Sequence, residues 1–265
     1  MLFKFFKYEG TGNDFVIIDN RDLNFDKKNK QLVIDICDRK KGVGSDGLIL
    51  LENHNSLNFK MLYYNADGSE SGFCGNGSRC ITHLAKDLEL IAQNAVFQAI
   101  DGEHVSKINN GLISVKMNDV SISNIINYDD NYKTTFIDSG SPHLIMLCSE
   151  IDNLNIVDKA RQLKRAFSEF KNGININFCE IKNDKIKLRT YERGVEDETL
   201  SCGTGAVATA IFLRHHNLFQ NEKIKILMKG GELSVELHKN SNTYSDIWLS
   251  GEVNKVFVGT FNSAQ

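Results

Sequence analysis

The sequence predicts an α+β protein with two pseudo-symmetric domains, each a mostly antiparallel sheet wrapped around a central helix. The first observation is a motif that occurs twice, as Glu70–Gly77 and as Glu198–Gly205, and reads E-x-x-x-C-G-x-G in both copies. The second is that the segment after the second copy, Ala206–Leu213, is small or apolar on every side. A helix without a polar face has to be buried, which favours a central helix over an outer helix of a doubly wound layer.

The repeat extends beyond the motif. Cys74 and Cys202 occupy the same place in the two copies, and other blocks align without gaps at the offset that separates these cysteines. Thr11-Gly12-Asn13 falls on Ser139-Gly140-Ser141, and Tyr63 falls on Tyr191. Several blocks at one offset indicate an old duplication, so we expect two similar halves, each with one cysteine at the start of a helix.

Length and composition are those of an ordinary globular chain. The 265 residues favour about two domains, and Lys and Arg are scattered under a net charge of −3, so we expect no nucleic-acid partner. The longest apolar run, Leu144–Cys148, is far shorter than the ~20 residues that span a bilayer. Charge interrupts the first residues too early for a signal peptide, so we expect a cytoplasmic protein without a membrane partner.

The cysteines and histidines give no metal pattern. Six cysteines in a chain of this length are expected as thiols of a reducing compartment, and no C-x-x-C occurs. The histidines are dispersed, so no metal site is expected. His215 and His216 are adjacent and are expected at the surface near a helix end. The cysteines outside the repeated motif sit in apolar patterns and are expected as small buried residues.

In the first half, the pattern predicts an edge strand, a glycine turn at 10–13 and a buried strand at 15–19. Helices are expected at 32–37 and after Gly77, with further strands at 48–51, 58–64, 96–100, 105–108 and 112–117. Gly42–Gly47 matches G-x-G-x-x-G, but it precedes a strand rather than opening a helix. We therefore reject dinucleotide binding there and expect a plain glycine turn.

The second half repeats this scheme. Strands are expected at 134–138, 144–147, 174–181 and 185–191, an amphipathic helix along Ala160, Leu163, Ala166, Phe167 and Phe170, and the last strands between 224 and 258. The pattern loosens at 121–131. We therefore expect one domain at 1–120, joined by the last strand at about 253–265, and a second domain at 121–252.

A C-G-x-G segment at a helix start favours chemistry. Glycines leave backbone N–H groups unobstructed, and the helix end adds about half a positive charge, so the segment can bind a carboxylate and activate a nearby thiol. A lone cysteine of this kind is more often a small buried residue. Two of them, from two homologous halves that face each other across a cleft, can remove a proton from one face of a carbon and return one to the other face. Nothing in the sequence indicates a pyridoxal cofactor, so we expect no cofactor.

The same residues resemble the diaminopimelate epimerases, a family of cofactor-independent two-cysteine enzymes of lysine and cell-wall precursor biosynthesis. The matching blocks run through the whole chain in family order: Gly10–Phe15, Gly42–Asp46, Asn65–Gly68, Cys74–Cys80, Gly140–His143, Asn175 with Phe178, and Tyr191–Gly194 through Cys202–Gly205. Within them, C-G-N-G-x-R-C is the most specific. The resemblance implies the fold predicted above, with the active site in the interdomain cleft, and diaminopimelate as the substrate.

The resemblance also implies the site residues. Cys74 and Cys202 would be the catalytic base and acid, in roles that exchange with the direction of the reaction. The carboxylate at the reacting carbon would be held by Gly75, Asn76, Gly203 and Thr204, and the remaining amino and carboxylate groups by Asn13, Asn65, Asn175, Glu192 and Arg193. His143 and Ser141 would support the site. Asparagine offers both donor and acceptor, and arginine can hold a carboxylate with two hydrogen bonds.

Three positions depart from the family pattern. Gly47 lies where some relatives carry a substrate-binding glutamine, Ser141 stands where some carry asparagine, and the loop Gly194–Thr199 is one residue longer. Two alternatives remain at this point. A proline or hydroxyproline racemase is the nearer, although its first motif typically reads C-G-H-G, and a redox-sensing thiol pair is the other. The oligomeric state is open, with a homodimer as one option.

Overall fold

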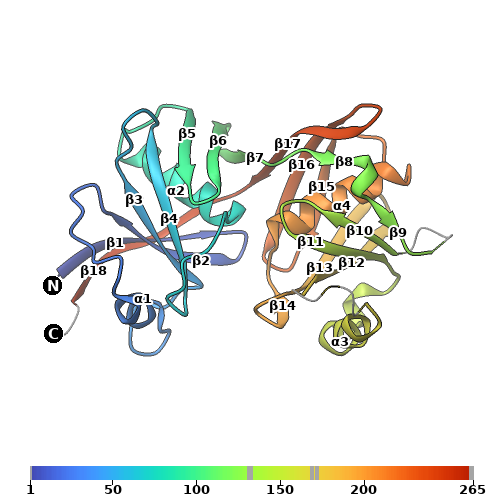
Figure 1. The fold of residues 1–265 in the computed structure, drawn as a ribbon, viewed down its shortest axis with the longest axis horizontal. Helices are drawn as coiled ribbons and strands as arrows, with labels where there is room; N and C mark the ends of the chain where they lie inside the picture. The colour runs from blue at the N-terminus through green and yellow to red at the C-terminus, as the bar shows by residue number, and fades with distance from the viewer. Residues whose placement is uncertain (1, 130–133, 168–169, 171–172, 263–265) are drawn as a thin grey trace. The chain divides into compact units, whose positions relative to one another are not determined.

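The structure, a computed structural model, describes residues 2–129, 134–167, 170 and 173–262. The chain divides into two compact units (Figure 1). Unit 1 comprises Met1–Val115 and Gly251–Gln265, and unit 2 comprises Lys116–Ser250. The first boundary therefore falls a few residues before the one expected from the sequence, at the end of a strand instead of in the looser stretch that follows.

The described residues of unit 1 form two helices and a sheet. Its elements are β1 (Leu2–Gly10), β2 (Asn13–Asp19), α1 (Lys30–Cys37), β3 (Gly47–Glu52), β4 (Phe59–Asn65), α2 (Gly75–Asp87), β5 (Asn94–Ala99), β6 (Gly102–Asn109), β7 (Leu112–Lys116) and β18 (Asn254–Asn262). β2 runs parallel to β3 and β4 parallel to β5, while β3–β4, β5–β6 and β6–β7 are antiparallel. β1 pairs with β2 on one side and β18 on the other, so the expectation of an edge strand is wrong. The partner that covers it is the last strand, which was expected to join this half but not to pair with β1.

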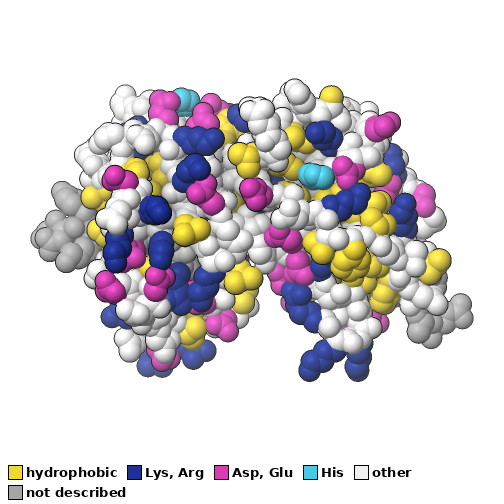
Figure 2. Space-filling model, turned by 180° about the vertical axis from the view of Figure 1, so that it is seen from behind, with side chains coloured by type: hydrophobic (Ala, Val, Ile, Leu, Met, Phe, Trp, Pro, Cys, Tyr) yellow, Lys and Arg dark blue, Asp and Glu magenta, His cyan; other side chains and the backbone are white. Residues whose placement is uncertain are grey.

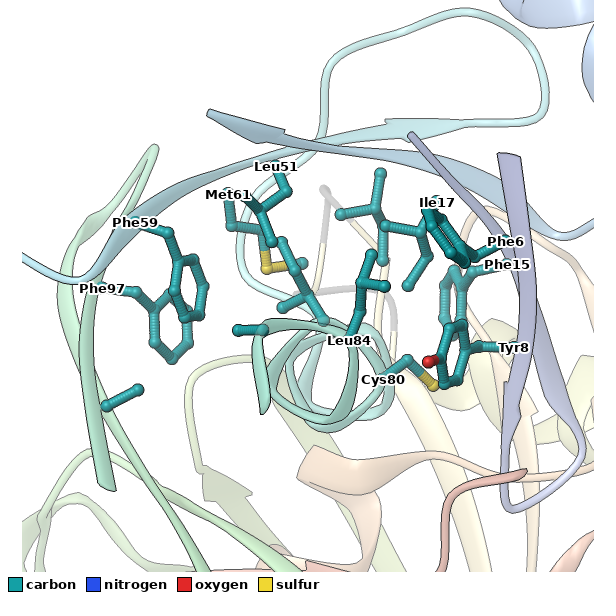
Figure 3. Packing of buried hydrophobic residues seen from close by; sticks show 14 of the residues in the cluster. Phe6, Tyr8, Phe15, Ile17, Leu51, Phe59, Met61, Cys80, Leu84 and Phe97 are labelled. Carbon is teal, nitrogen blue, oxygen red and sulfur yellow. The ribbon is translucent and has the colours of Figure 1, made fainter. Parts of the chain in front are cut away.

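Helix α2 lies inside this sheet. Figure 3 shows the helix end-on, with aromatic and aliphatic side chains of the surrounding strands packed around it: Phe6, Tyr8 and Phe15 on one side, Leu51 and Met61 on another, and Phe59 and Phe97 opposite. The helix contributes Cys80, Ile81, Leu84 and Ala85, which are fully buried. The apolar stripe expected after Gly77 therefore marks the contact face of a central helix.

Unit 2 repeats the arrangement. Its elements are β8 (Val120–Ser121), η1 (Ile122–Asn124), β9 (Ile126–Asn127), β10 (Thr134–Asp138), β11 (Pro142–Leu147), η2 (Ile151–Asn153), α3 (Ile156–Ala166), β12 (Asn175–Lys182), β13 (Lys185–Glu192), β14 (Asp197–Thr199), α4 (Gly203–His215), β15 (Lys223–Met228), β16 (Gly231–Lys239) and β17 (Thr243–Gly251). Helix α3 was expected to reach Phe170 but ends before it. Phe170 lies outside the helix and packs against the hydrophobic cluster that contains Ile156 and Ala160 of α3. β14 lies where a loop was expected and pairs with β13.

The duplication is visible in the register. Helices α2 and α4 both have 13 residues and begin at Gly75 and Gly203. In unit 1, Phe15 pairs with Gly47 across parallel strands, and in unit 2 His143 pairs with Asn175 in the same way. Phe15 and His143 are separated by the same number of residues as Cys74 and Cys202, and so are Gly47 and Asn175. The predicted fold class, with a sheet wrapped around a central helix in each half, is confirmed.

Charged side chains of both signs share one face of the molecule. On the face shown in Figure 2, lysine and arginine side chains are interspersed with aspartate and glutamate. Among the helices of the described residues, none combines the length and the apolar character needed to span a membrane. His215 and His216 are half-buried instead of lying at the surface, and His216 Nε2 is 2.9 Å from the Thr135 hydroxyl, because the end of α4 is still enclosed by β10.

Candidate active site

Cys74 occupies the N-cap position of α2. Its backbone is extended, and the Gly77 amide donates a hydrogen bond to its sulfur at 3.4 Å. The side-chain oxygen of Asn13 lies 3.9 Å from the same sulfur. The preceding residue, Phe73, stacks on His104 of β6 with ring centroids 4.1 Å apart, which holds the chain as it enters the helix. The thiol therefore sits at the positive end of a buried helix, where a thiolate is favoured.

A chain of amides orients Asn13 beside Cys74. Arg79 Nη2 donates to Asn76 Oδ1 at 2.9 Å, Asn76 Nδ2 donates to Asn13 Oδ1 at 3.3 Å, and Asn13 Nδ2 donates to Asp46 Oδ2 at 2.6 Å. The guanidinium can only donate and the carboxylate can only accept, so neither amide can turn over without losing a bond. The structure therefore brings Asn13, Gly75 and Asn76 together around Cys74.

Arg79 belongs to the first cysteine motif, although the resemblance gave it no role. It is fully buried in α2, its Nη2 also donates to Thr11 Oγ1 at 3.0 Å, and its Nη1 donates to the Gly75 carbonyl at 3.4 Å. Among the residues that the structure describes, no carboxylate forms an ion pair with it. Burial lowers its pKa, while the proximity of Cys80, Cys74 and Glu9 opposes that shift. The signal that could have revealed its importance is an arginine on the buried side of a helix.

Asn65 and Gly47 meet at the end of β4. They are paired in register, and Asn65 Nδ2 donates to Ser69 Oγ at 3.2 Å. A Cβ atom at Gly47 would lie 2.6 Å from the Tyr64 carbonyl oxygen and 2.6 Å from the Tyr63 ring. A backbone oxygen cannot move aside easily, so a side chain such as the glutamine of some relatives does not fit here without a shift of β4.

Cys202 occupies the same position at the start of α4. Its sulfur lies 3.6 Å from the Thr204 hydroxyl, and that hydroxyl is 2.9 Å from His143 Nε2. Ser139 Oγ donates to the Thr204 carbonyl at 2.8 Å, which fixes the first turn of the helix. His143, Thr204 and Cys202 are therefore brought together.

His143 is buried and neutral. Its Nδ1 is 2.9 Å from Asn177 Nδ2. Burial and the nearby charge of Arg193 lower the pKa of His143 to about 3. A histidine with this pKa does not exchange protons near neutral pH, so it acts as a fixed hydrogen-bonding group. Asn177 was not selected from the sequence, where it reads as one residue of a buried strand.

The buried imidazole predicts a pH dependence of stability. The unfolded chain protonates His143 near pH 6.5 and the folded protein only near pH 3, so the unfolded state binds more protons between these values. The contribution of His143 to stability is complete above pH 6.5 and is lost as the pH falls, by up to about 1.4 kcal/mol per pH unit. Denaturant unfolding of wild type and His143→Gln at pH 7, 6 and 5 should show the difference between them shrinking with acid. Parallel curves would contradict it.

Asn175 connects two site segments of unit 2. Its Nδ2 donates to Ser141 Oγ at 2.9 Å and to the Pro142 carbonyl at 3.1 Å, and its Oδ1 accepts from the Arg193 amide at 3.0 Å. The expected residues Ser141, Asn175 and Arg193 therefore lie together, with Glu192 at the end of β13. In this structure the Asn175 amide holds its neighbours in place.

Proteins of known structure share the fold of this chain. Solved structures with the same fold include a hydroxyproline epimerase from Agrobacterium vitis (TM-score 0.68, 13% identity, covering 98% of this chain and 92% of that one). A PhzF-family phenazine biosynthesis protein from Bacillus anthracis is also similar (TM-score 0.77, 12% identity, 99% and 100%). At these identities the likeness shows the fold alone, so the chain is placed among proteins with this two-unit fold.

The family follows from the sequence comparisons. A family model described as diaminopimelate epimerase matches residues 5–122 and 135–256. A diaminopimelate epimerase from Flavobacterium psychrophilum is 44% identical over 259 residues, covering 97% of this chain and 99% of that protein. One from Aquifex aeolicus is 34% identical over 97% of this chain and 96% of that protein. The chain belongs to the diaminopimelate epimerase family.

Proposed function

We propose that this protein is a diaminopimelate epimerase that interconverts LL-diaminopimelate and meso-diaminopimelate, a step of lysine and peptidoglycan-precursor biosynthesis. The observation that carries the proposal is the pair of cysteines at equivalent N-cap positions of two homologous buried helices, in a chain of this family. The racemase alternative shares the fold, whereas the relatives named above share the sequence along nearly the whole chain.

In the proposed reaction one thiolate takes the α-proton from one face of the substrate carbon, and the thiol of the other cysteine gives a proton to the opposite face. One C–H bond breaks and one forms, and the charge passes from one sulfur to the other, so no oxidant or cofactor is consumed. The intermediate is a carbanion next to a carboxylate. Preorganised donors in a site without water have to stabilise it, because no cofactor delocalises its charge.

The donors proposed for this task are backbone N–H groups at the two helix starts, from Gly75, Asn76, Gly203 and Thr204. Glycines and a helix N-terminus suit them to a carboxylate. Asn13, Asn65, Asn175, Glu192 and Arg193 are proposed to recognise the other amino and carboxylate groups, with His143 and Ser141 in support. Their mutual hydrogen bonds, such as Asn175 to Ser141, would hold them in place before substrate binds.

We infer a cytoplasmic protein that works on a small molecule, without nucleic acid or membrane. The cysteines outside the motif are free thiols in the structure, as a reducing compartment allows. We also infer a homodimer. β18 exposes three successive hydrophobic side chains, Val256, Phe257 and Val258, at 54%, 46% and 46%. Exposed apolar strands of this kind favour association, and sedimentation velocity of the full chain decides it.

The test of the proposed function is incubation of the purified protein with LL-diaminopimelate in deuterium oxide. The product should be meso-diaminopimelate with one deuteron at the inverted α-carbon, because that proton comes from a solvent-exchanged thiol. L-Proline, tested in parallel, should neither racemise nor exchange. Exchange on proline without exchange on diaminopimelate would assign the racemase activity instead, and no exchange on either substrate would overturn the proposal.

A further inference from the structure

Unit 2 contains a buried hydrogen-bonded chain that ends at Cys202. It runs from Thr190 through Asn177, His143 and Thr204 to the sulfur, with separations of 2.9, 2.9, 2.9 and 3.6 Å. Thr190, Asn177 and His143 have no exposed surface. Buried polar groups are costly unless they are satisfied, so the direction of each bond in such a chain is strongly constrained.

The side-chain amide of Asn177 determines which group donates and which accepts in each hydrogen bond of the chain. Its Nδ2 also lies 3.4 Å from the Leu144 carbonyl, which can only accept, and its Oδ1 accepts from the Thr190 hydroxyl. The amide nitrogen therefore faces Leu144 and His143 and donates to both. His143 Nδ1 must accept, so the proton of the neutral ring is on Nε2.

The same direction continues to the sulfur. His143 Nε2–H donates to Thr204 Oγ1, which occupies that oxygen as an acceptor and leaves its own proton to be directed elsewhere. Within the described part of the chain, the other polar contact of this hydroxyl is Cys202 Sγ. The Thr204 proton therefore points at the sulfur, where it stabilises the negative charge of a thiolate.

Unit 1 lacks this chain. At the offset that relates the two halves, His143 corresponds to Phe15, Asn177 to Ile49 and Thr204 to Asn76. The correspondence is also spatial. A Cβ atom at Gly77 would lie 2.9 Å from Ile49, and one at Gly205 would lie 2.7 Å from Asn177 Oδ1. The fold can therefore be built with apolar residues in place of His143 and Asn177, so the polar pair in unit 2 is not required for packing.

The ionisable groups around the chain leave it without a protonated histidine. Arg193 is the charged group that acts on His143, and it opposes protonation of the ring. Cys179, which lies on β12 like Asn177, remains a thiol because burial raises its pKa far above the usual range. At the other end of α4, burial lowers the pKa of His216 to about 4, so this ring is neutral as well.

We propose that His143 and Asn177 are positioning residues that direct the Thr204 hydroxyl proton at Cys202 and thereby stabilise the Cys202 thiolate before substrate binds. The proposal rests on the proposed function for the role of Cys202 as a proton acceptor. The sulfur in unit 1 has a different neighbour, the acceptor oxygen of Asn13, at 3.9 Å. The two thiols are therefore not equivalent in the resting enzyme.

The first test is alkylation of the full-length protein by iodoacetamide without substrate, with the rate at each cysteine followed by peptide mass spectrometry between pH 5 and 10. In Thr204→Val, the pH midpoint for Cys202 should rise by about one unit, or about tenfold in rate below the midpoint, because a hydrogen bond to a charged group is lost. Cys74 serves as the internal reference and should not change. Thr204→Ser keeps the hydroxyl and should keep the wild-type midpoint.

A shared midpoint for wild type and Thr204→Val would overturn the proposal, as would a serine variant that behaves like valine. The second measurement needs no variant at Thr204. Nitrogen-15 spectra of histidine-labelled wild type, assigned with His143→Gln, should show the proton on Nε2 at pH 7. A proton on Nδ1 would reverse the chain and reject the proposal. Both measurements are made without turnover, so they remain decisive if the proposed epimerase activity is absent.

Discussion

Replacing either Cys74 or Cys202 with alanine is expected to lower kcat for epimerisation of LL-diaminopimelate by about 100- to 10,000-fold. This is the usual effect of removing a general acid or base, and each cysteine is proposed to serve as one of them in every turnover. The loss should appear in kcat with little change in KM, because the sulfur is proposed to act on the reacting proton instead of holding the substrate.

Exchange in deuterium oxide separates the two variants. Each retains one thiol, which can still remove and return a proton on its own face of the carbon. One variant should therefore exchange the α-proton of the LL isomer without inverting it, and the other should exchange only the meso isomer at its D centre. Cys80→Ala is the matched control, since Cys80 is fully buried in α2 and burial raises its pKa far above the usual range. Wild-type turnover in Cys74→Ala or Cys202→Ala would refute the two-thiol mechanism.

The second large effect is on stability. Leu213→Ala is expected to lower the free energy of unfolding by about 2–5 kcal/mol, because Leu213 lies in α4 with no exposed surface and its loss leaves a cavity. This is a large part of the about 5–15 kcal/mol that stabilises an ordinary domain. Trp248, the single tryptophan, lies on β17 of unit 2, so its fluorescence in a denaturant titration reports the unfolding of unit 2.

Leu227→Ala in the same unit is the matched control. Leu227 is 44% exposed on β15, and its truncation should change the free energy of unfolding by only about 0.5 kcal/mol. Equal effects of the two substitutions would mean that α4 does not lie at the centre of the unit.

Much of the fold could be predicted because it depends on patterns within short segments and on blocks that occur in both halves of the sequence. The run Ala206–Leu213 has no polar face, and the structure shows the whole of it buried. The constant offset between matching blocks predicts two similar halves even before the strands are placed. The last strand was expected to join the first half, but the sequence does not show which strand it pairs with, so β1 was expected at an edge although β18 covers it. Helix α3 was expected to include Phe170 because the apolar stripe of the helix continues to that residue. In the structure the helix ends earlier, and Phe170 packs against the same cluster from outside it.

The candidate site was only partly accessible from sequence. The resemblance selected Cys202, Thr204 and His143, and the structure places them in contact. Asn177 was missed because nothing in a buried strand reveals which side chain meets a ring on the neighbouring strand. The repeat itself carries a signal for Asn177. Comparing the halves position by position sets Asn177 against Ile49, and a polar residue in an apolar position of its own duplicate indicates a function.

The most direct measurement of the central claim is a crystal structure of the full chain with a substrate analogue bound. The account predicts the sulfurs of Cys74 and Cys202 on opposite faces of a single substrate carbon, each about 3–3.5 Å from it, as proton transfer in both directions requires. Sulfurs that face separate cavities, or an analogue in contact with only one of them, would contradict it.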